Sequence, residues 1–196
     1  MQRVGNFTCF FTQSDMFSNW YRIGFSIDNV PFNCGEQAMM YYKAMLFKDH
    51  STAQKILREP SPRVQKALGR QVAGFSDAVW LQHRESIMEK ICAARFSQNP
   101  ALSKALLDTA GTQLVEASPY DRIWGAGLAA SDPHIADPAK WPGLNLLGKV
   151  LDRVRERLAH AEQSRNSLAN QNRTADYEPA HEQETPRYVF APAMKG

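Results

Sequence analysis

One lysine interrupts an otherwise apolar stretch of the sequence. Residues 36–47 read EQAMMYYKAMLF, and Lys43 stands there among methionines, tyrosines and a phenylalanine. Lysine is strongly hydrated and is rarely buried without a partner or a function. Burial lowers the pKa of an amine, and a neutral amine can attack an aldehyde or the reactive carbon of a sugar. The alternative is a surface lysine whose stem packs on apolar neighbours while its charge reaches water.

Glu36 precedes Lys43 by seven residues, which is nearly two turns of a helix. The two side chains would share one helix face about 10 Å apart along the axis, beyond the three- or four-residue spacing of helical ion pairs. Both groups are then free to contact one ligand held between them. A structural role is the alternative for Glu36, because a carboxylate in the first turn stabilises the N-terminus of a helix.

A second segment with chemical potential is EASPYDRIWGAGL, residues 116–128. Asp121 fits either the cap of a turn or a second acid–base carboxylate. Trp124 could stack on a base, although a tryptophan more commonly fills a core. Gly125 and Gly127 permit close approach of the backbone to another group, but two glycines alone are a weak signal for phosphate binding.

Aromatic and basic residues elsewhere could complete a binding site. Four tryptophans permit an aromatic-lined pocket, although each of them also suits the core: Trp20, Trp80, Trp124 and Trp141. Arg63, Lys66 and Arg70 recur at helical spacing, which is more typical of a solvated face than of a phosphate site.

The composition is that of an ordinary soluble protein. The chain has 196 residues, 43% of them apolar and 22% charged, with a net charge of +3. This length suits one domain, and no run approaches the ~20 apolar residues of a membrane span. The N-terminus lacks the features of a secretory signal, so we expect a cytoplasmic protein without membrane contact. Three separated cysteines and five scattered histidines show no ligand spacing, so we expect no metal and no other cofactor.

The hydrophobic pattern predicts one α+β domain, mainly helical, with a small β-sheet. Strands are expected within residues 6–32, with a turn at DNVP, and at 113–118, while residues 123–131 fit either a strand or a glycine-rich loop. Helices are expected at about 36–47, 51–58, 62–69, 77–96, 100–111 and 146–161.

The ends of two helices carry capping signals. Asn33 with Glu36 forms a capping-box pattern, and Asn145 fits the N-cap of the last helix. Residues 161–196 are polar and without period, so we expect a domain at 1–160 followed by a disordered tail.

In order and spacing, several segments resemble the NADAR family. They are FSNWY, PFNCGEQAMMYYKAMLF, LGRQVAGF with Trp80, RFSQNPALSKALLDTAGTQLVEASPYDRIWGAGL and NLLGKVLDRVRERL, which together span about residues 7–158. The resemblance implies an N-glycosidase whose substrate is a ribosylaminopyrimidine phosphate of riboflavin synthesis or ADP-ribose attached to a guanine base. The base could be free or part of a modified nucleic acid. Ala38 and Leu144 depart from the residues usual in the family, which could alter the shape of the pocket.

The resemblance also implies roles for individual residues. Glu36, Lys43 and Asp121 would be catalytic. The substrate would contact Asn19, Trp20, Tyr21, Trp80, Ser118, Arg122, Trp124, Gly125 and Asn145. The tryptophans would enclose base and sugar, and Arg122 or the basic residues at 63–70 would meet phosphate.

Two chemical routes and two functions remain open at this point. A carboxylate could stabilise positive charge on the ribose while a second group activates water or protonates the base. Alternatively, Lys43 could attack C1 and form a Schiff base with the opened ribose. The rival function is a module that binds ADP-ribose without turnover, and the presence of all three catalytic candidates favours the enzyme.

Overall fold

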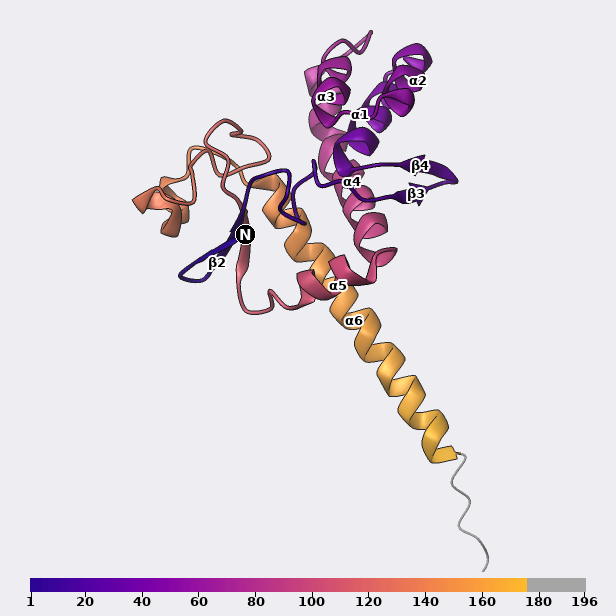
Figure 1. Ribbon diagram of the computed structural model, residues 1–196, viewed down its shortest axis with the longest axis vertical. Coiled ribbons are helices and arrows are strands. Elements are labelled where there is room, and N and C mark those ends of the chain that lie inside the picture. Colours follow the sequence, from indigo (N-terminus) through magenta and orange to yellow (C-terminus); the bar gives the residue numbers. More distant parts are fainter. Residues whose placement is uncertain (176–196) are drawn as a thin grey trace, which may run out of the picture. The chain divides into compact units, whose positions relative to one another are not determined.

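The computed structural model of the protein describes residues 1–175. Residues Met1–Ala161 form one compact unit, and a second unit begins at Glu162. Within the described residues the architecture is α+β and mainly helical, as the sequence predicts (Figure 1).

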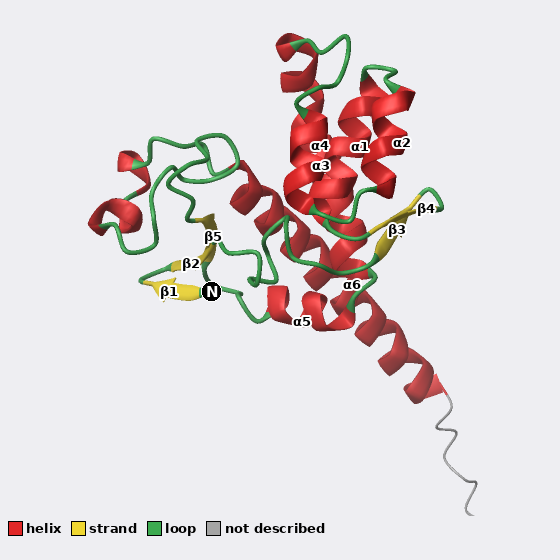
Figure 2. Ribbon diagram, turned by 45° about the horizontal axis from the view of Figure 1, so that its top comes forward, coloured by secondary structure: helices red, strands yellow, loops and turns green. Residues whose placement is uncertain are grey.

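Three strands form a small sheet in the order β1–β2–β5, namely β1 (Gln2–Val4), β2 (Phe7–Phe10) and β5 (Gln113–Glu116). β1 pairs antiparallel with β2, whereas β2 pairs in parallel with β5, so that Phe10 lies opposite Glu116. A parallel pair needs a crossover connection, and here helices α1–α5 lie between the two strands in the chain (Figure 2).

Two further strands, β3 (Phe25–Ile27) and β4 (Val30–Phe32), form an antiparallel hairpin. Asp28 and Asn29 connect them with φ angles of 52° and 63°. Aspartate and asparagine favour this mirror-image turn, whose twist matches that of the flanking strands. The turn was predicted, whereas β1 lies outside the range in which strands were expected.

Six helices lie within the described residues, close to their predicted positions. They are α1 (Gly35–Leu46), α2 (His50–Arg58), α3 (Pro62–Gly69), α4 (Asp77–Ser97), α5 (Pro100–Leu107) and α6 (Leu146–Ala175). α5 is shorter than expected because it ends at Leu107 rather than near Gly111. Residues 123–131 form a loop, followed by two short 3₁₀ turns, η1 (Pro133–Ala136) and η2 (Pro138–Lys140).

The start of α1 differs from the predicted capping box. Cys34, not Asn33, is the N-cap, and its Sγ accepts a hydrogen bond from the Gln37 amide at 3.5 Å. The Asn33 amide donates to Gln37 Oε1 at 2.7 Å, and Asn33 Oδ1 accepts from Gln65 Nε2 at 3.1 Å. Asn33 is therefore held by α1 and α3 through tertiary contacts, and Glu36 is free of any capping role.

The two faces of the three-stranded sheet pack against different parts of the unit. Phe7, Cys9 and Val115 contact the loop between β5 and α6. Phe10 and Leu114 instead join the main core, which includes buried residues of α1, α4 and α6. Because side chains alternate along a strand, Glu116 lies on the same face as Leu114, towards the helices.

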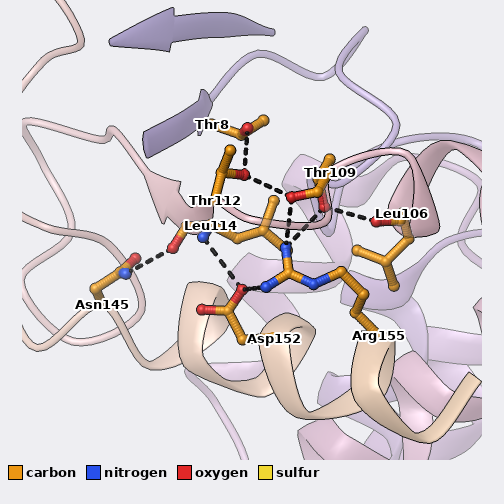
Figure 3. A network of polar contacts seen from close by, with 8 residues as sticks. All are labelled: Thr8, Leu106, Thr109, Thr112, Leu114, Asn145, Asp152 and Arg155. Atoms are coloured by element: carbon orange, nitrogen blue, oxygen red, sulfur yellow. Dashed lines mark hydrogen bonds and ion pairs between the residues drawn. The ribbon is translucent and has the colours of Figure 1, made fainter. Parts of the chain in front are cut away.

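The first turns of α6 are bound to β5 by polar contacts (Figure 3). Asn145 Nδ2 donates to the Leu114 carbonyl at 2.9 Å, and Asp152 Oδ1 accepts from the Leu114 amide at 3.2 Å. Arg155 pairs with Asp152 at 2.8 Å and donates to the Thr109 hydroxyl at 2.8 Å. Asn145 precedes the helix, as predicted for an N-cap, but its side chain bonds the strand because the buried strand edge needs partners.

α6 continues beyond the predicted end of the ordered domain. It runs to Ala175, whereas a disordered tail was expected from residue 161. Every residue from His160 to Ala169 is exposed, which agrees with the polar composition of this segment. Adding residues to a formed helix is far easier than nucleating one, and Ala, Glu, Gln and Arg are good helix formers. The prediction for residues 176–196 lies outside the described residues.

Across residues 1–175, none of the helices has the length and apolar character that crossing a bilayer requires.

Candidate active site

A cavity of about 230 Å³ opens between α1, α3, α4, the end of β5 and two loops. Seven of the twelve predicted site residues line it: Asn19, Trp20, Glu36, Lys43, Trp80, Asp121 and Trp124. These residues come from segments more than 100 positions apart in the chain, so the fold brings them together. Among the described residues there is no group of three histidine, cysteine or carboxylate side chains placed to hold a metal ion.

Glu36 lies in the first turn of α1 with only 4% of its surface exposed. Its Oε2 accepts a hydrogen bond from Trp20 Nε1 at 3.3 Å. Its Oε1 is shielded from solvent and has no hydrogen-bond partner among the described residues. Burial raises the pKa of this carboxyl, while the charge of Lys66 and the Trp20 hydrogen bond act in the opposite direction. A buried carboxylate with a free oxygen is suited to stabilise positive charge on a ligand.

Lys43 lies two turns further along α1 and is half-buried. Its Nζ donates to the Gly69 carbonyl at 2.9 Å and lies 4.1 Å from the centroid of the Phe75 ring. Desolvation lowers the pKa of Lys43, partly offset by the charge of Asp77. Lys43 forms no ion pair with a carboxylate in the part of the chain that the structure describes. The prediction that Glu36 and Lys43 share a helix face without pairing agrees with this geometry.

Gly69 allows α3 to approach α1 closely at this point. A Cβ atom on Gly69 would lie 1.9 Å from Met40 Sδ, which is far inside van der Waals contact. The absent side chain therefore lets the Gly69 carbonyl reach Lys43 and fix the direction of its amine.

Asp121 caps a turn, which is one of the two roles predicted for it, and it also lines the cavity. Its Oδ1 accepts hydrogen bonds from the amides of Ile123 at 2.9 Å and Trp124 at 2.8 Å, so it caps the turn that follows. The same carboxyl group lines the cavity, where its charge raises the pKa values of Glu36 and Glu116. Its hydrogen bonds also fix Trp124 at the cavity wall.

A buried arginine holds the loop that carries Asn19 and Trp20. Arg95 in α4 is fully buried and donates to the carbonyls of Ser18 at 2.9 Å and Phe17 at 3.2 Å. The Asn19 carbonyl accepts from the Glu36 amide at 2.9 Å, which joins this loop to the start of α1. Trp20 is thereby placed within hydrogen-bond reach of Glu36.

Five predicted substrate-binding residues do not line this cavity: Tyr21, Ser118, Arg122, Gly125 and Asn145. Tyr21 lines a separate groove, and Ser118 lines a second hollow that adjoins the cavity. Arg122 is exposed.

Gly125 and Asn145 have structural contacts instead. A Cβ on Gly125 would lie 2.9 Å from the Glu116 carbonyl, and Asn145 is completely buried against β5. Gly125 thus shows the close backbone approach that its sequence suggested, whereas Asn145 shapes the site because its side chain holds β5.

Three further charged residues that were not among the predicted site residues line the cavity: Lys66, Arg70 and Glu116. Lys66 and Arg70 belong to the basic cluster whose spacing favoured a solvated face and which the family resemblance left open as a phosphate site. Arg63 of the same cluster is exposed and does not line the cavity. The spacing of four residues between Lys66 and Arg70, which places both on one helix face, was the sequence feature that could have indicated a shared site.

Glu116 is the most unusual of these groups. It is half-buried at the end of β5, and its Oε2 is shielded from solvent without a hydrogen-bond partner among the described residues. Burial and the nearby charge of Asp121 raise the pKa of Glu116 to about 8. The sequence signal for this group was a carboxylate within a predicted strand that is otherwise mostly apolar.

The sequence and structure match a known family. The model of the NADAR domain matches residues 9–159. The chain belongs to the NADAR family. Protein irg-1 of Caenorhabditis elegans is 39% identical over 172 residues, which cover 80% of this chain and 81% of the relative. N-glycosidase R617 of Acanthamoeba polyphaga mimivirus is 40% identical over 146 residues, covering 72% and 86%.

A solved structure supports the NADAR fold. The NMR structure of the Escherichia coli protein YbiA matches with a TM-score of 0.64 and 26% identity over 90% of this chain and 92% of YbiA. The predicted fold class and family are therefore confirmed. The NADAR match ends close to the point where the first compact unit ends.

Proposed function

We propose that this NADAR protein hydrolyses the N-glycosidic bond between a 5′-phosphorylated ribose and a nitrogenous base. One observation carries the proposal. Glu36 and Lys43 face the same tryptophan-lined cavity, and within residues 1–175 neither forms an ion pair with the other or with another charged residue. A buried carboxylate and an amine of lowered pKa are groups that chemistry at C1 of a ribose can use.

The charges around the cavity support a phosphorylated substrate. Lys66 and Arg70 lie on its α3 side and would meet the phosphate, which is one of the two alternatives that the family resemblance implied; the other was Arg122. Lys66 Nζ lies 6.0 Å from the ring centroid of Trp20, so the cationic and aromatic parts of the site are adjacent. Trp20, Trp80 and Trp124 would then enclose base and sugar.

Lys43 is the proposed nucleophile. Its attack on C1 breaks the bond to the base, and opening of the ribose ring then gives a Schiff base that water hydrolyses. Glu36 would stabilise the positive charge that develops on the sugar. Attack by water without a covalent intermediate is the alternative route to the same products.

The substrate class is the finer part of the proposal. Named N-glycosidases among the relatives support hydrolysis of an N-glycosidic bond. A ribosylaminopyrimidine phosphate and an ADP-ribosylated guanosine share a ribose bonded to nitrogen at C1 and a phosphate on the 5′ carbon.

The test is to incubate the purified protein with each of these compounds and measure release of the base. We expect release from at least one of them. Binding of ADP-ribose without release of base from either compound would favour the non-catalytic binding module instead.

A further inference from the structure

We propose that Glu116 is a further catalytic residue of this cavity, the general acid that protonates the departing base. The inference rests on the proposed hydrolysis of an N-glycosidic bond. It follows from the position of a third carboxyl group that neither of the two predicted acidic residues accounts for.

The geometry places Glu116 at the wall of the cavity. It ends β5, and the alternation of side chains turns it to the same face as Leu114, towards α1 and α6. Glu116 lines the same cavity as Glu36 and Asp121, and it also lines the adjoining hollow that contains Ser118. Its shielded Oε2 has no partner among the described residues, so this oxygen is available to a ligand.

The hydrogen bonds around the carboxyl groups divide their roles. Glu36 accepts a hydrogen bond from Trp20, and Asp121 accepts hydrogen bonds from two backbone amides, so each of these two carboxyl groups has a donor in place. No described donor lies within hydrogen-bond distance of Glu116 Oε2, and two other carboxyl groups share its cavity. Like charges cannot all be ionised at close range in a partly buried site, so one carboxyl remains protonated.

The pKa of Glu116 agrees with this division. Burial raises it to about 8, and the charges of Asp121 and Glu36 act in the same direction, while Lys66 opposes them. At neutral pH the group therefore carries a proton that it can donate.

The proton of Glu116 neutralises the departing base. The C1–N bond breaks with its electron pair remaining on the nitrogen, and the Glu116 proton moves to that nitrogen, so that a neutral base leaves. Glu116 becomes a carboxylate, and the water consumed in the hydrolysis supplies the hydroxyl group of the sugar and restores the proton. Protonation of this kind contributes about 10²–10⁴-fold to the rate when the leaving base is a poor leaving group.

The backbone of Glu116 is fixed on both sides. Its amide donates to Asn145 Oδ1 at 3.0 Å, and its carbonyl accepts from the Ala126 amide at 2.9 Å. Asn145 also holds the Leu114 carbonyl, so one side chain spans the last residues of the strand (Figure 3). Asn145 is thus a positioning residue for Glu116, and Gly125 permits the close approach of the neighbouring loop.

The experiment compares kcat/KM as a function of pH for the wild-type protein, Glu116→Gln and Glu156→Gln, with the better of the two substrates named above. Glutamine has nearly the same shape but no proton of suitable acidity, and Glu156 is exposed on α6 away from the cavity. In the wild type we expect the rate to fall as pH rises through about 8, because Glu116 then loses its proton. In Glu116→Gln we expect a loss of about 10²–10⁴-fold and no such fall, with Glu156→Gln unchanged.

Glu116→Asp retains an acid and serves as the second variant. We expect it to keep the fall at alkaline pH with a rate between those of the wild type and Glu116→Gln. The inference is overturned if folded Glu116→Gln keeps the alkaline fall or loses less than about threefold. A wild-type protein that releases no base would overturn the proposed function instead, so the two failures are distinguishable.

Discussion

Lys43 has the two properties that a nucleophilic amine requires. Its Nζ is held at 2.9 Å from the Gly69 carbonyl, which fixes its direction, and burial lowers its pKa. A lowered pKa leaves more of the neutral amine at a given pH, so activity should rise with pH until that pKa is passed. Together with loss of the Glu116 proton above about pH 8, this predicts a bell-shaped dependence of kcat/KM on pH.

The covalent route through Lys43 can be tested directly. Borohydride added during turnover should reduce a Schiff base and leave a ribose adduct on Lys43, which peptide mass spectrometry would locate. Lys43→Met should lose at least about 10³-fold in kcat, because methionine fills the space but has no amine. Lys55→Met, at an exposed position on α2, is the matched control. An active enzyme that gives no adduct would indicate direct attack by water.

At the scale of elements, α4 supports the site through Arg95. This buried guanidinium donates to two carbonyls of the loop that carries Trp20, and it has no ion pair with a carboxylate in residues 1–169. Arg95→Met leaves both carbonyls without these donors, so we expect unfolding free energy to fall by about 3 kcal/mol. Urea denaturation would measure it.

Arg95→Lys should restore only part of that stability, because one ammonium group cannot replace the planar fork of the guanidinium. An equally stable lysine variant would show that charge alone holds the loop.

The joint between β5 and α6 is the second supporting element. Asn145→Ala leaves the Leu114 carbonyl and the Glu116 amide without their partner, for a loss of about 2–4 kcal/mol in stability. Because Glu116 would no longer be held, kcat should fall more than substrate affinity, and the alkaline fall of the pH profile should shift. Asn166→Ala, on the exposed part of α6, is the control. A loss of stability with an unchanged pH profile would limit Asn145 to a structural role.

The contacts between β5 and α6 illustrate which parts of the site could not be predicted from the sequence. Glu36 and Lys43 were placed on one face correctly because helical periodicity is a local property of the chain. Glu116, Lys66 and Arg70 reach the cavity only because β5 pairs in parallel with a strand more than 100 residues earlier and α3 packs on α1. Asn145 was matched by its motif to substrate binding, although its side-chain nitrogen and oxygen both bond β5. Tertiary contacts decide which of these residues reach the cavity and which role Asn145 has. Such contacts cannot be read from the local pattern of one sequence.

At the scale of the whole molecule, the first compact unit contains every residue of the cavity. The unit ends at Ala161, the NADAR match ends at residue 159, and the buried stripe of α6 ends at Val154, with Leu158 partly buried. Packing of an apolar face, rather than propensity, supplies most of the stability of a helix in a protein. The protein shortened to residues 1–161 should therefore fold and keep kcat/KM within about twofold, whereas shortening to residues 1–149 removes Val150, Leu151 and Val154 from the core and should prevent folding. Circular dichroism and base release would measure both. If the chain of 161 residues folded but lost activity, the region after Ala161 would have to act on the site.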